Sequence, residues 1–320
     1  MAEPSGPQRW VVLGASGFVG RQVAEAARAA GHLVEEVAGP RLSSYAVDVD
    51  EVVSDAVGRV TERDALAVTF QGVDVVVNAA GLATPDTVSS PALTGANAVL
   101  PLVVADAAER AGVRRYVHLS SAAVQGARDR LDETLATAPF SPYSASKALA
   151  EGALAASTAA GRGSRAGVVI VRATSVQGAG RPTTMRLKSL SRSPFASVAA
   201  PGDAPSPVTS VQALAEFVVE VGDHPGPLPL VVLQPWEGMT VSSVLEAAGG
   251  RRPRRLPRAF CRIVIRAGNL VTKAAGGRGT GTVRRVELMW FGQDQVPGWA
   301  SDAGVDVTRR VADVLSEATR

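Results

Sequence analysis

Continuous apolar runs alternate with longer, alanine-rich segments through the first half of this chain of 320 residues. The runs are rich in valine, which is typical of strands that are buried on both faces of a sheet. The segments between them are long enough for crossover helices. The sequence therefore predicts an α/β fold with a doubly wound parallel sheet. The strands of this sheet are expected at residues 10–15, 32–38, 73–81, 113–121 and 167–178, with helices at about 18–30 and at 93–112 and a third that carries Tyr143.

The pattern becomes less regular after about residue 180. Residues 180–207 are rich in glycine, proline and serine and predict loops with one short helix. Further on, the sequence predicts helices at about 210–222, at 240–248, at about 256–275 and at about 305–319, and a strand at 228–234.

Three parts are expected along the chain. Residues 1–8 form a flexible N-terminus, and residues 9–178 form the sheet domain. Residues 179–320 mainly form a smaller lobe over the carboxyl ends of the strands, where open α/β folds bind ligands, so we expect this lobe to bind the substrate. Segments near 208–235 return to the sheet domain.

Composition limits the kinds of partner. The net charge of +3 gives no reason to expect nucleic-acid binding. A single cysteine, Cys261, excludes an internal disulfide and fits a reducing cytoplasm. With only three histidines beside it, the sequence predicts no transition-metal site. The first ten residues lack the pattern of a signal peptide, and no run of 18 apolar residues predicts a membrane span. We therefore expect a cytoplasmic protein.

A turn with three glycines follows the first predicted strand. Glycines at these positions permit a tight turn and the close approach of a pyrophosphate, which binds at the N-terminus of the next helix. A plain strand-to-helix turn is the alternative. The sequence predicts that a dinucleotide contacts this turn through Gly14, Ser16, Gly17, Phe18, Val19 and Gly20.

A tyrosine and a lysine stand four residues apart in "SPYSASKALAE", residues 141–151. On a helix this spacing places Tyr143 and Lys147 on the same face. Alone, the pair fits an ordinary surface helix. Its position after a predicted dinucleotide site suggests instead that it transfers a proton.

Four ordered motifs give the sequence a family resemblance: Gly-x-x-Gly-x-x-Gly, "NAAG" at 78–81, "SS" at 120–121 and Tyr143-x-x-x-Lys147. It resembles the short-chain dehydrogenase/reductase family, and most closely the extended branch of NAD-dependent epimerases and dehydratases that act mainly on nucleotide sugars. The resemblance runs from about Trp10 to Gly178 and continues faintly through 207–219. It implies that 9–178 form an NAD(P)-binding Rossmann domain, with cofactor contacts also from Ala79, Ala80, Gly81, Asn97, Tyr143 and Lys147.

The resemblance also implies catalytic roles for Ser121, Tyr143 and Lys147. An unperturbed phenol has a pKa of about 10, and a nearby ammonium favours its phenolate. Tyr143 would therefore exchange the proton while an alcohol and a ketone interconvert. Ser121 would orient the substrate oxygen. It is favoured over Ser120 because the family's serine or threonine stands five residues before a glycine, here Gly126.

The cofactor is expected to be NADP or NAD, with NADP slightly favoured. In the family an acidic residue that binds the adenosine ribose ends the second strand, and Ala38 has that position here. Arg41, three residues later, can pair with a 2′-phosphate. In the family the next strand usually ends in an aspartate near the adenine, and this chain has an arginine, Arg59, at about that position. Solvated arginines are the alternative at both places.

The residues after Ser121 bear on the reaction. Family members that eliminate water from a sugar have an acid–base pair there, and this chain has Ala122 and Ala123. A 4,6-dehydratase is therefore disfavoured, and a 4-epimerase or a 4-ketoreductase of a nucleotide-linked sugar is expected. An NADPH-dependent ketoreductase of a steroid- or polyketide-like substrate and a non-catalytic NAD(P)-binding sensor are the alternatives.

Residues 251–286 contain eleven lysines and arginines and no acidic residue. Within them Arg258, Arg262 and Arg266 alternate with an apolar stripe, which includes Leu256, Phe260, Ile263, Ala267 and Leu270. This basic amphipathic segment suggests peripheral membrane contact or binding of a diphosphate, and a solvated face over a packed one is the alternative. We also expect a homodimer.

Overall fold

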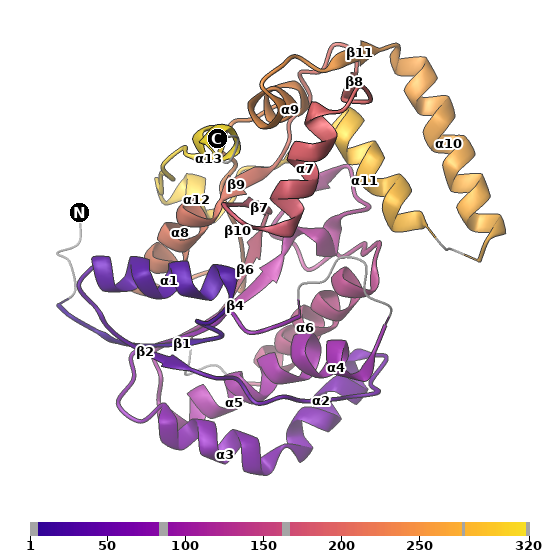
Figure 1. Ribbon diagram of the computed structural model, residues 1–320. Coiled ribbons are helices and arrows are strands. Elements are labelled where there is room, and N and C mark those ends of the chain that lie inside the picture. Colours follow the sequence, from indigo (N-terminus) through magenta and orange to yellow (C-terminus); the bar gives the residue numbers. More distant parts are fainter. Residues whose placement is uncertain (1–5, 83–88, 162–166, 277–278, 318–320) are drawn as a thin grey trace.

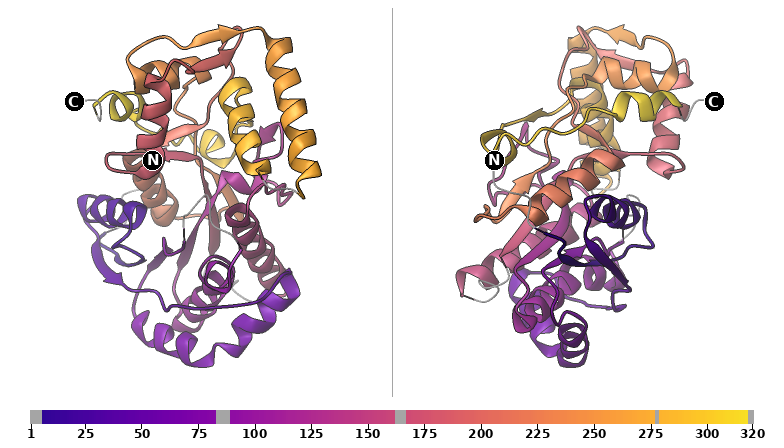
Figure 2. Two further views of the ribbon diagram at one scale, coloured as in Figure 1. Left: turned by 45° about the vertical axis from the view of Figure 1, so that its right-hand side comes forward. Right: turned by 90° about the vertical axis from the view of Figure 1, so that its left-hand side faces the viewer.

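The computed structural model describes residues 6–82, 89–161, 167–276 and 279–317. A parallel sheet with helices on both faces forms the lower part of the molecule in Figure 1, and a smaller lobe covers one end of it (Figures 1 and 2). The predicted α/β fold class is confirmed. The strands of the sheet lie side by side in the order β2 (Leu33–Val37), β1 (Arg9–Leu13), β3 (Val75–Asn78), β4 (Arg115–Ser121), β6 (Val168–Ala173) and β10 (Val231–Leu233).

The order of the strands fixes where a ligand can bind. The chain passes from β1 to β2 on one side and then returns to place β3 on the other side of β1. At such a switch point the two connections leave in opposite directions and open a crevice at the carboxyl ends of the strands. The glycine turn lies at this crevice, directly after β1.

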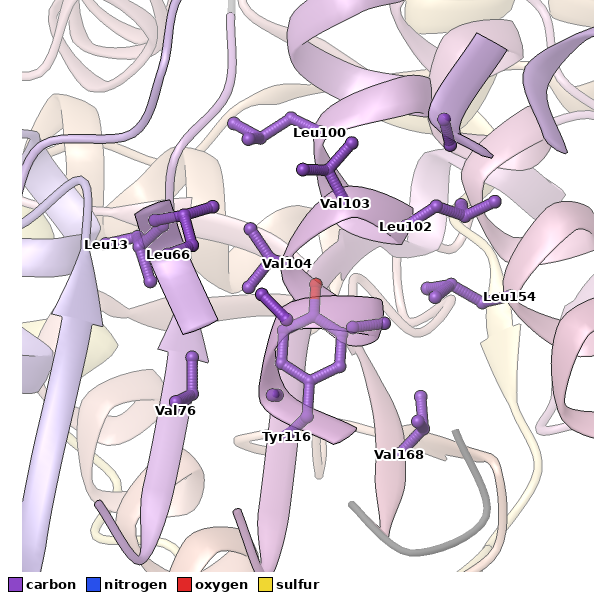
Figure 3. Packing of buried hydrophobic residues seen from close by; sticks show 14 of the residues in the cluster. Leu13, Leu66, Val76, Leu100, Leu102, Val103, Val104, Tyr116, Leu154 and Val168 are labelled. Atoms are coloured by element: carbon purple, nitrogen blue, oxygen red, sulfur yellow. The ribbon is translucent and has the colours of Figure 1, made fainter. Parts of the chain in front are cut away.

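Alternate residues of each strand enter two separate cores. Val11 and Leu13 of β1 belong to one core, and Trp10 and Val12 belong to the other. This is the period of two that a pleated strand imposes on its side chains. Figure 3 shows the first core, with Val104 close to the ring of Tyr116. The helices around the sheet are α1 (Phe18–Ala29) and α8 (Val211–Asp223) on one face, and α2 (Val49–Gly58), α3 (Val60–Thr69), α5 (Leu100–Ala111) and α6 (Pro142–Ala159) on the other.

One helix in the described part of the chain, Pro91–Ala111, is long and apolar enough to cross a membrane. It consists of α4 (Pro91–Thr94), the π-helical turn η1 (Gly95–Val99) and α5. Its most apolar window is 78% buried inside the protein. The apolar character of this helix is therefore accounted for by its place in the core.

The smaller lobe is built largely from the second half of the chain. Three two-stranded parallel sheets, β7-β9, β5-β12 and β8-β11, connect its segments. Its elements are η2 (Ala122–Gln125), β5 (Arg130–Leu131), β7 (Ser175–Gln177), α7 (Pro182–Arg192), β8 (Ser197–Ala199), β9 (Val208–Ser210), α9 (Val241–Gly249), β11 (Arg254–Leu256), α10 (Arg258–Ala274), α11 (Thr280–Phe291), β12 (Asp294–Gln295), α12 (Trp299–Asp302) and α13 (Val311–Glu317).

Some elements differ from the sequence-based expectations. The single helix expected at 93–112 is interrupted by the π-helical turn, and α11 was not anticipated. α11 follows a glycine-rich stretch and has a weak apolar pattern of its own, but Val283, Val286 and Trp290 pack in one cluster with residues of α10. Tertiary packing therefore stabilises a helix that the local sequence does not predict.

Candidate active site

The first turn of α6 presents Tyr143. Ser141 is the N-cap, and its hydroxyl accepts a hydrogen bond from the backbone N–H of Ser144 at 3.2 Å. The hydroxyl of Ser144 accepts from the backbone N–H of Ser141 at 3.0 Å, which completes a capping box. Pro142 follows the cap at the first helical position, where its missing N–H removes no helical hydrogen bond. The sequence thus fixes the start of the helix, and with it the shared face of Tyr143 and Lys147.

Two adjacent serines at the end of β4 have different partners. The hydroxyl of Ser120 is buried and donates to Glu151 Oε1 at 2.5 Å. Ser121 follows on the other side of the strand, where it lines one cavity with Tyr143 and lowers the pKa of the phenol that burial raises. The Ser121 hydroxyl also accepts from the backbone N–H of Ala123 at 3.2 Å. Alternation along the strand therefore brings Ser121, and not Ser120, to the tyrosine.

Lys147 lies deeper than Tyr143. Its Nζ donates to the carbonyl oxygen of Leu119 at 2.8 Å, and its side chain is buried. Burial lowers the pKa of Lys147 to about 8, and the nearby carboxylate of Glu151 opposes this shift. Glu151 is itself paired with Arg172 at 2.6 Å, with both side chains buried. The lysine is thus held among the strand ends, and its ammonium loses its proton in an accessible pH range.

Burial raises the pKa of the Tyr143 phenol, whereas the hydrogen bond to Ser121 and the charge of Arg181 lower it. Arg181 precedes α7, and its guanidinium carbon lies 5.1 Å from the centroid of the Phe18 ring. The guanidinium also donates to the carbonyl oxygen of Val176 at 2.5 Å. This arginine was not predicted from the sequence. Its place shortly after a strand that reaches the carboxyl edge was the available signal.

The glycine turn fits the approach of a phosphate. Gly14 has a φ of 79°, and a Cβ there would lie 2.7 Å from the backbone of Ala80. A Cβ at Gly20 would lie 2.2 Å from the carbonyl oxygen of Gly14. The N-terminus of α1 has no side-chain cap and no acidic residue in its first turn, and Ser16 and Gly17 are exposed before it. An open helix N-terminus of this kind binds anions, and the partly exposed Phe18 and Val19 begin the helix.

Asn97 connects the end of β3 to α6. Its Oδ1 accepts from the backbone N–H of Leu82 at 2.8 Å, and its Nδ2 donates to the Leu82 carbonyl oxygen at 3.0 Å and to Ser146 Oγ at 3.1 Å. A Cβ at Gly81 would lie 2.8 Å from Asn97 Oδ1 and 3.5 Å from Lys147 Nζ. Asn97 therefore positions the 79–81 segment beside Lys147, at the carboxyl end of the sheet.

The two arginines considered for the adenosine end lie in different settings. Arg41 is exposed in the loop that follows β2. Arg59 stands between α2 and α3, so the expectation that a strand precedes it is wrong. It donates to Asp55 Oδ1 at 2.9 Å and to the carbonyl oxygen of Ser43 at 2.8 Å. Arg59 therefore has a structural role, whereas the side chain of Arg41 is exposed.

A cavity of about 420 Å³ lies between the sheet edge and the smaller lobe. Ser121, Tyr143 and Arg181 line it together with Ala122 and Ala123. The Oγ1 of Thr174, another lining residue, has no hydrogen-bond partner among the described residues. The apolar part of the wall comes mainly from α9 and α11 and their surroundings, with Leu187, Val208, Val241, Val244, Leu245, Leu288 and Met289.

A glycine turn at the switch point of a parallel sheet is typical of proteins that bind a dinucleotide, and comparison with known proteins gives the family. Residues 10–199 match the NAD dependent epimerase/dehydratase family. The match spans more than half of the chain, so the protein belongs to this family, as the motifs indicated. No curated protein matches the chain.

Solved structures share the fold over nearly the whole chain. UDP-glucuronic acid 4-epimerase from Bacillus cereus, solved with NAD, has a TM-score of 0.63 and 16% identity, over 96% of this chain and 94% of that one. UDP-N-acetylglucosamine 4-epimerase from Methanobrevibacter ruminantium, in complex with UDP-N-acetylmuramic acid, has a TM-score of 0.63 and 17% identity, over 98% and 97%. A dTDP-4-dehydrorhamnose reductase from Clostridium acetobutylicum has a TM-score of 0.55 and 19% identity, over 78% and 83%. At these identities the likeness establishes the fold.

Proposed function

We propose that this protein interconverts a secondary alcohol and a ketone on a nucleotide-linked sugar, with NADP or NAD as cofactor. The observation that carries the proposal is that Ser121 and Tyr143 line one cavity at the carboxyl edge of the sheet, with Lys147 one turn farther along α6. A purely structural tyrosine would need neither a cavity nor a hydroxyl partner at the end of a strand. Ser121 can orient the substrate oxygen, Tyr143 can exchange the proton, and Lys147 supplies the cation that stabilises the phenolate.

The chain's own residues move the proton. In the reducing direction the phenol of Tyr143 gives its proton to the carbonyl oxygen of the substrate, and in the oxidising direction the phenolate takes the proton of the hydroxyl. Ser121 donates a hydrogen bond to the same oxygen, and the cations of Lys147 and Arg181 stabilise the phenolate. The cofactor, when bound at the glycine turn and the 79–81 segment, supplies or accepts the hydride.

Charges in the cavity support an anionic substrate. Arg181 and Arg285 line it, and none of its described lining residues is acidic. Guanidinium groups pair well with phosphate, which favours a diphosphate-linked sugar. Ala122 and Ala123 also line the cavity, and neither carries a group that can move a proton. Water elimination is therefore disfavoured, while epimerisation and net reduction both need only the groups present.

The apolar part of the wall favours a second candidate. Leu245, Leu288 and Met289 offer no hydrogen bonds to a sugar, and they suit a ketone on a steroid- or polyketide-like body. The two candidates predict different activities. Oxidation of NADPH in the presence of nucleotide-linked 4-ketosugars supports the first, and oxidation only with apolar cyclic ketones supports the second.

Mass spectrometry of the purified protein tests how the cofactor is used. An epimerase returns the hydride to the same substrate and is expected to retain NAD through purification. A ketoreductase must exchange its cofactor, and it is expected to be isolated empty and to bind added NADPH. A protein that binds neither NAD nor NADPH contradicts the proposed function.

We expect Arg41 to set the preference for NADP. Replacing it by alanine removes a charge-assisted hydrogen bond to the 2′-phosphate, which contributes about 1.5–3 kcal/mol. NADPH should then bind about 10- to 100-fold more weakly, while the affinity for NADH should stay the same. Titration of both cofactors by fluorescence measures this change. Arg110→Ala, at an exposed arginine of α5, is the control, and equal losses for NADPH and NADH in Arg41→Ala would show that Arg41 does not read the 2′-phosphate.

Activity should depend on the protonation of Lys147. Its pKa is lowered to about 8 by burial, so the ammonium is lost as the pH rises through this value. Ketone reduction leaves a phenolate that the ammonium stabilises, and kcat for reduction should therefore fall above about pH 8. A pH profile of kcat measures this. In Lys147→Arg the guanidinium stays charged, so the fall should move to higher pH; a fall at the same pH in this variant assigns the titration to another group.

A further inference from the structure

α10 has an exposed apolar face. Figure 1 shows this helix at the periphery of the smaller lobe, far from the sheet, and Figure 2 agrees. Phe260, Ile263, Leu270 and Val271 follow one another at spacings of three, seven and one residues, which places them on one side of the helix. Their side chains are between 52% and 70% exposed. An isolated exposed apolar residue is ordinary, but a stripe along the length of a helix indicates contact with another apolar phase.

The helix does not need this stripe for its own packing. It is held to the protein by a different and narrower face, on which Cys261, Ile265 and Thr272 are buried. Cys261 and Ile265 pack in one cluster with Trp290 of α11. One alternative from the sequence was that the apolar stripe packs against the protein and only the charged face meets solvent. The structure differs from this alternative, because the larger part of the apolar stripe faces away from the protein.

A basic edge accompanies the stripe. Arg258, Arg262, Arg266 and Lys273 are all exposed on α10. Within the part of the chain that the structure describes, no carboxylate forms an ion pair with any of these four residues. Arg254 and Arg255 of β11 are also exposed just before the helix, and the backbone N–H of Arg254 donates to Ala196, next to the exposed Phe195. Phe195 and the two arginines of β11 therefore add an exposed aromatic group and two cations to this end of the lobe.

We propose that α10 docks the protein on an anionic phospholipid surface. An amphipathic helix with an apolar face and a basic edge lies in the interface between headgroups and acyl chains, with its apolar side chains inserted and its cations on the anionic headgroups. Charge complementarity favours lipid over a second copy of this chain. Two copies that met through the stripe would bring two basic edges together and supply no anions, since residues 251–286 contain none.

The docked face adjoins the candidate active site. α11 packs against α10, and its residues Arg285, Leu288 and Met289 line the cavity. Docking through α10 would therefore hold the cavity close to the lipid surface. The inference does not depend on the identity of the substrate.

Flotation with vesicles tests the proposal on the full chain. The wild-type protein should float with vesicles of phosphatidylglycerol, should not float with vesicles of phosphatidylcholine, and should be released by added salt. Ile263→Gln/Leu270→Gln should abolish flotation. Arg262→Gln/Arg266→Gln should lower the partition coefficient about 30-fold, from the typical contribution of a basic residue near an anionic surface.

A matched control separates docking from general hydrophobicity. Val68 on α3 is exposed to 74% but lies in the sheet domain, so Val68→Gln should float like the wild type. The altered side chains are exposed, so thermal unfolding and NADPH binding of all variants should stay unchanged. The proposal is wrong if the wild type does not float with phosphatidylglycerol or if Ile263→Gln/Leu270→Gln floats equally well. It is also wrong if sedimentation shows that this variant dissociates a dimer of the wild type, because the stripe is then a contact between copies.

Discussion

Replacement of Tyr143 by phenylalanine is expected to lower kcat by about 100- to 10,000-fold, the usual contribution of general acid–base catalysis. The change removes only the phenolic oxygen, whose pKa is raised by burial and lowered by Ser121 and by the charge of Arg181. Cofactor contacts at the glycine turn are not altered, so the Kd for the cofactor should change little. Steady-state kinetics and cofactor titration of the same preparation measure both quantities.

Tyr116→Phe is the matched control. Tyr116 is fully buried in the core, and its hydroxyl donates to the carbonyl oxygen of Pro101 at 2.9 Å. Loss of this hydroxyl should reduce the free energy of unfolding by about 1–3 kcal/mol, because the buried Asn78 Nδ2, which donates to it at 3.3 Å, is left unpaired, and should leave kcat unchanged. If Tyr143→Phe turned over as fast as Tyr116→Phe, Tyr143 would not be the group that transfers the proton.

The second large effect is expected at the ion pair beneath the site. Arg172 and Glu151 are both buried and lie 2.6 Å apart, and Arg172 also donates to the carbonyl oxygens of Asp132 and Thr134 at 2.8 Å each. Arg172→Met leaves the Glu151 carboxylate buried without its partner, which should reduce the free energy of unfolding by about 3–5 kcal/mol. The midpoint of urea unfolding measures the loss.

Two comparisons make this result specific. Arg28→Met breaks the half-exposed pair with Glu36 and should change the free energy of unfolding by less than about 1 kcal/mol. Arg172→Met/Glu151→Leu removes both buried charges and should recover part of the stability that the single variant loses. A loss in Arg172→Met no larger than that in Arg28→Met would mean that the buried carboxylate takes up a proton or finds another partner at little cost.

Local pattern was enough to predict the sheet and the turn after its first strand. β1, β3 and β6 are valine-rich runs whose two faces are both buried, so their sequences carry the signal directly. The glycine turn is equally recognisable from a short stretch of sequence, because its three glycines directly follow the first strand. The family assigned from these motifs is confirmed by the match of residues 10–199.

Features that depend on distant contacts could not be predicted. Ser120 donates to Glu151, and Glu151 is paired with Arg172. These three residues lie on β4, α6 and β6, and no sequence period connects the three elements. The effect of Arg181 on Tyr143 is also long-range, because Tyr143 belongs to α6 and Arg181 precedes α7. The exposure of the apolar stripe on α10 also could not be predicted, because it depends on contacts with another helix. A helical period shows that a stripe exists, and only the packing of Ile265 against α11 shows which face the protein covers.

Transfer of deuterium from the reduced cofactor tests the central claim most directly. The purified protein is incubated with NADPH or NADH that carries deuterium at the transferable position, and with nucleotide-linked 4-ketosugars and apolar cyclic ketones in parallel. Mass spectrometry of the products should find one deuterium on the carbon that bears the new hydroxyl group, and none with Tyr143→Phe. Cofactor that binds but keeps its deuterium beside every ketone, or products of the same mass whether the cofactor is labelled or not, would contradict hydride transfer at this site.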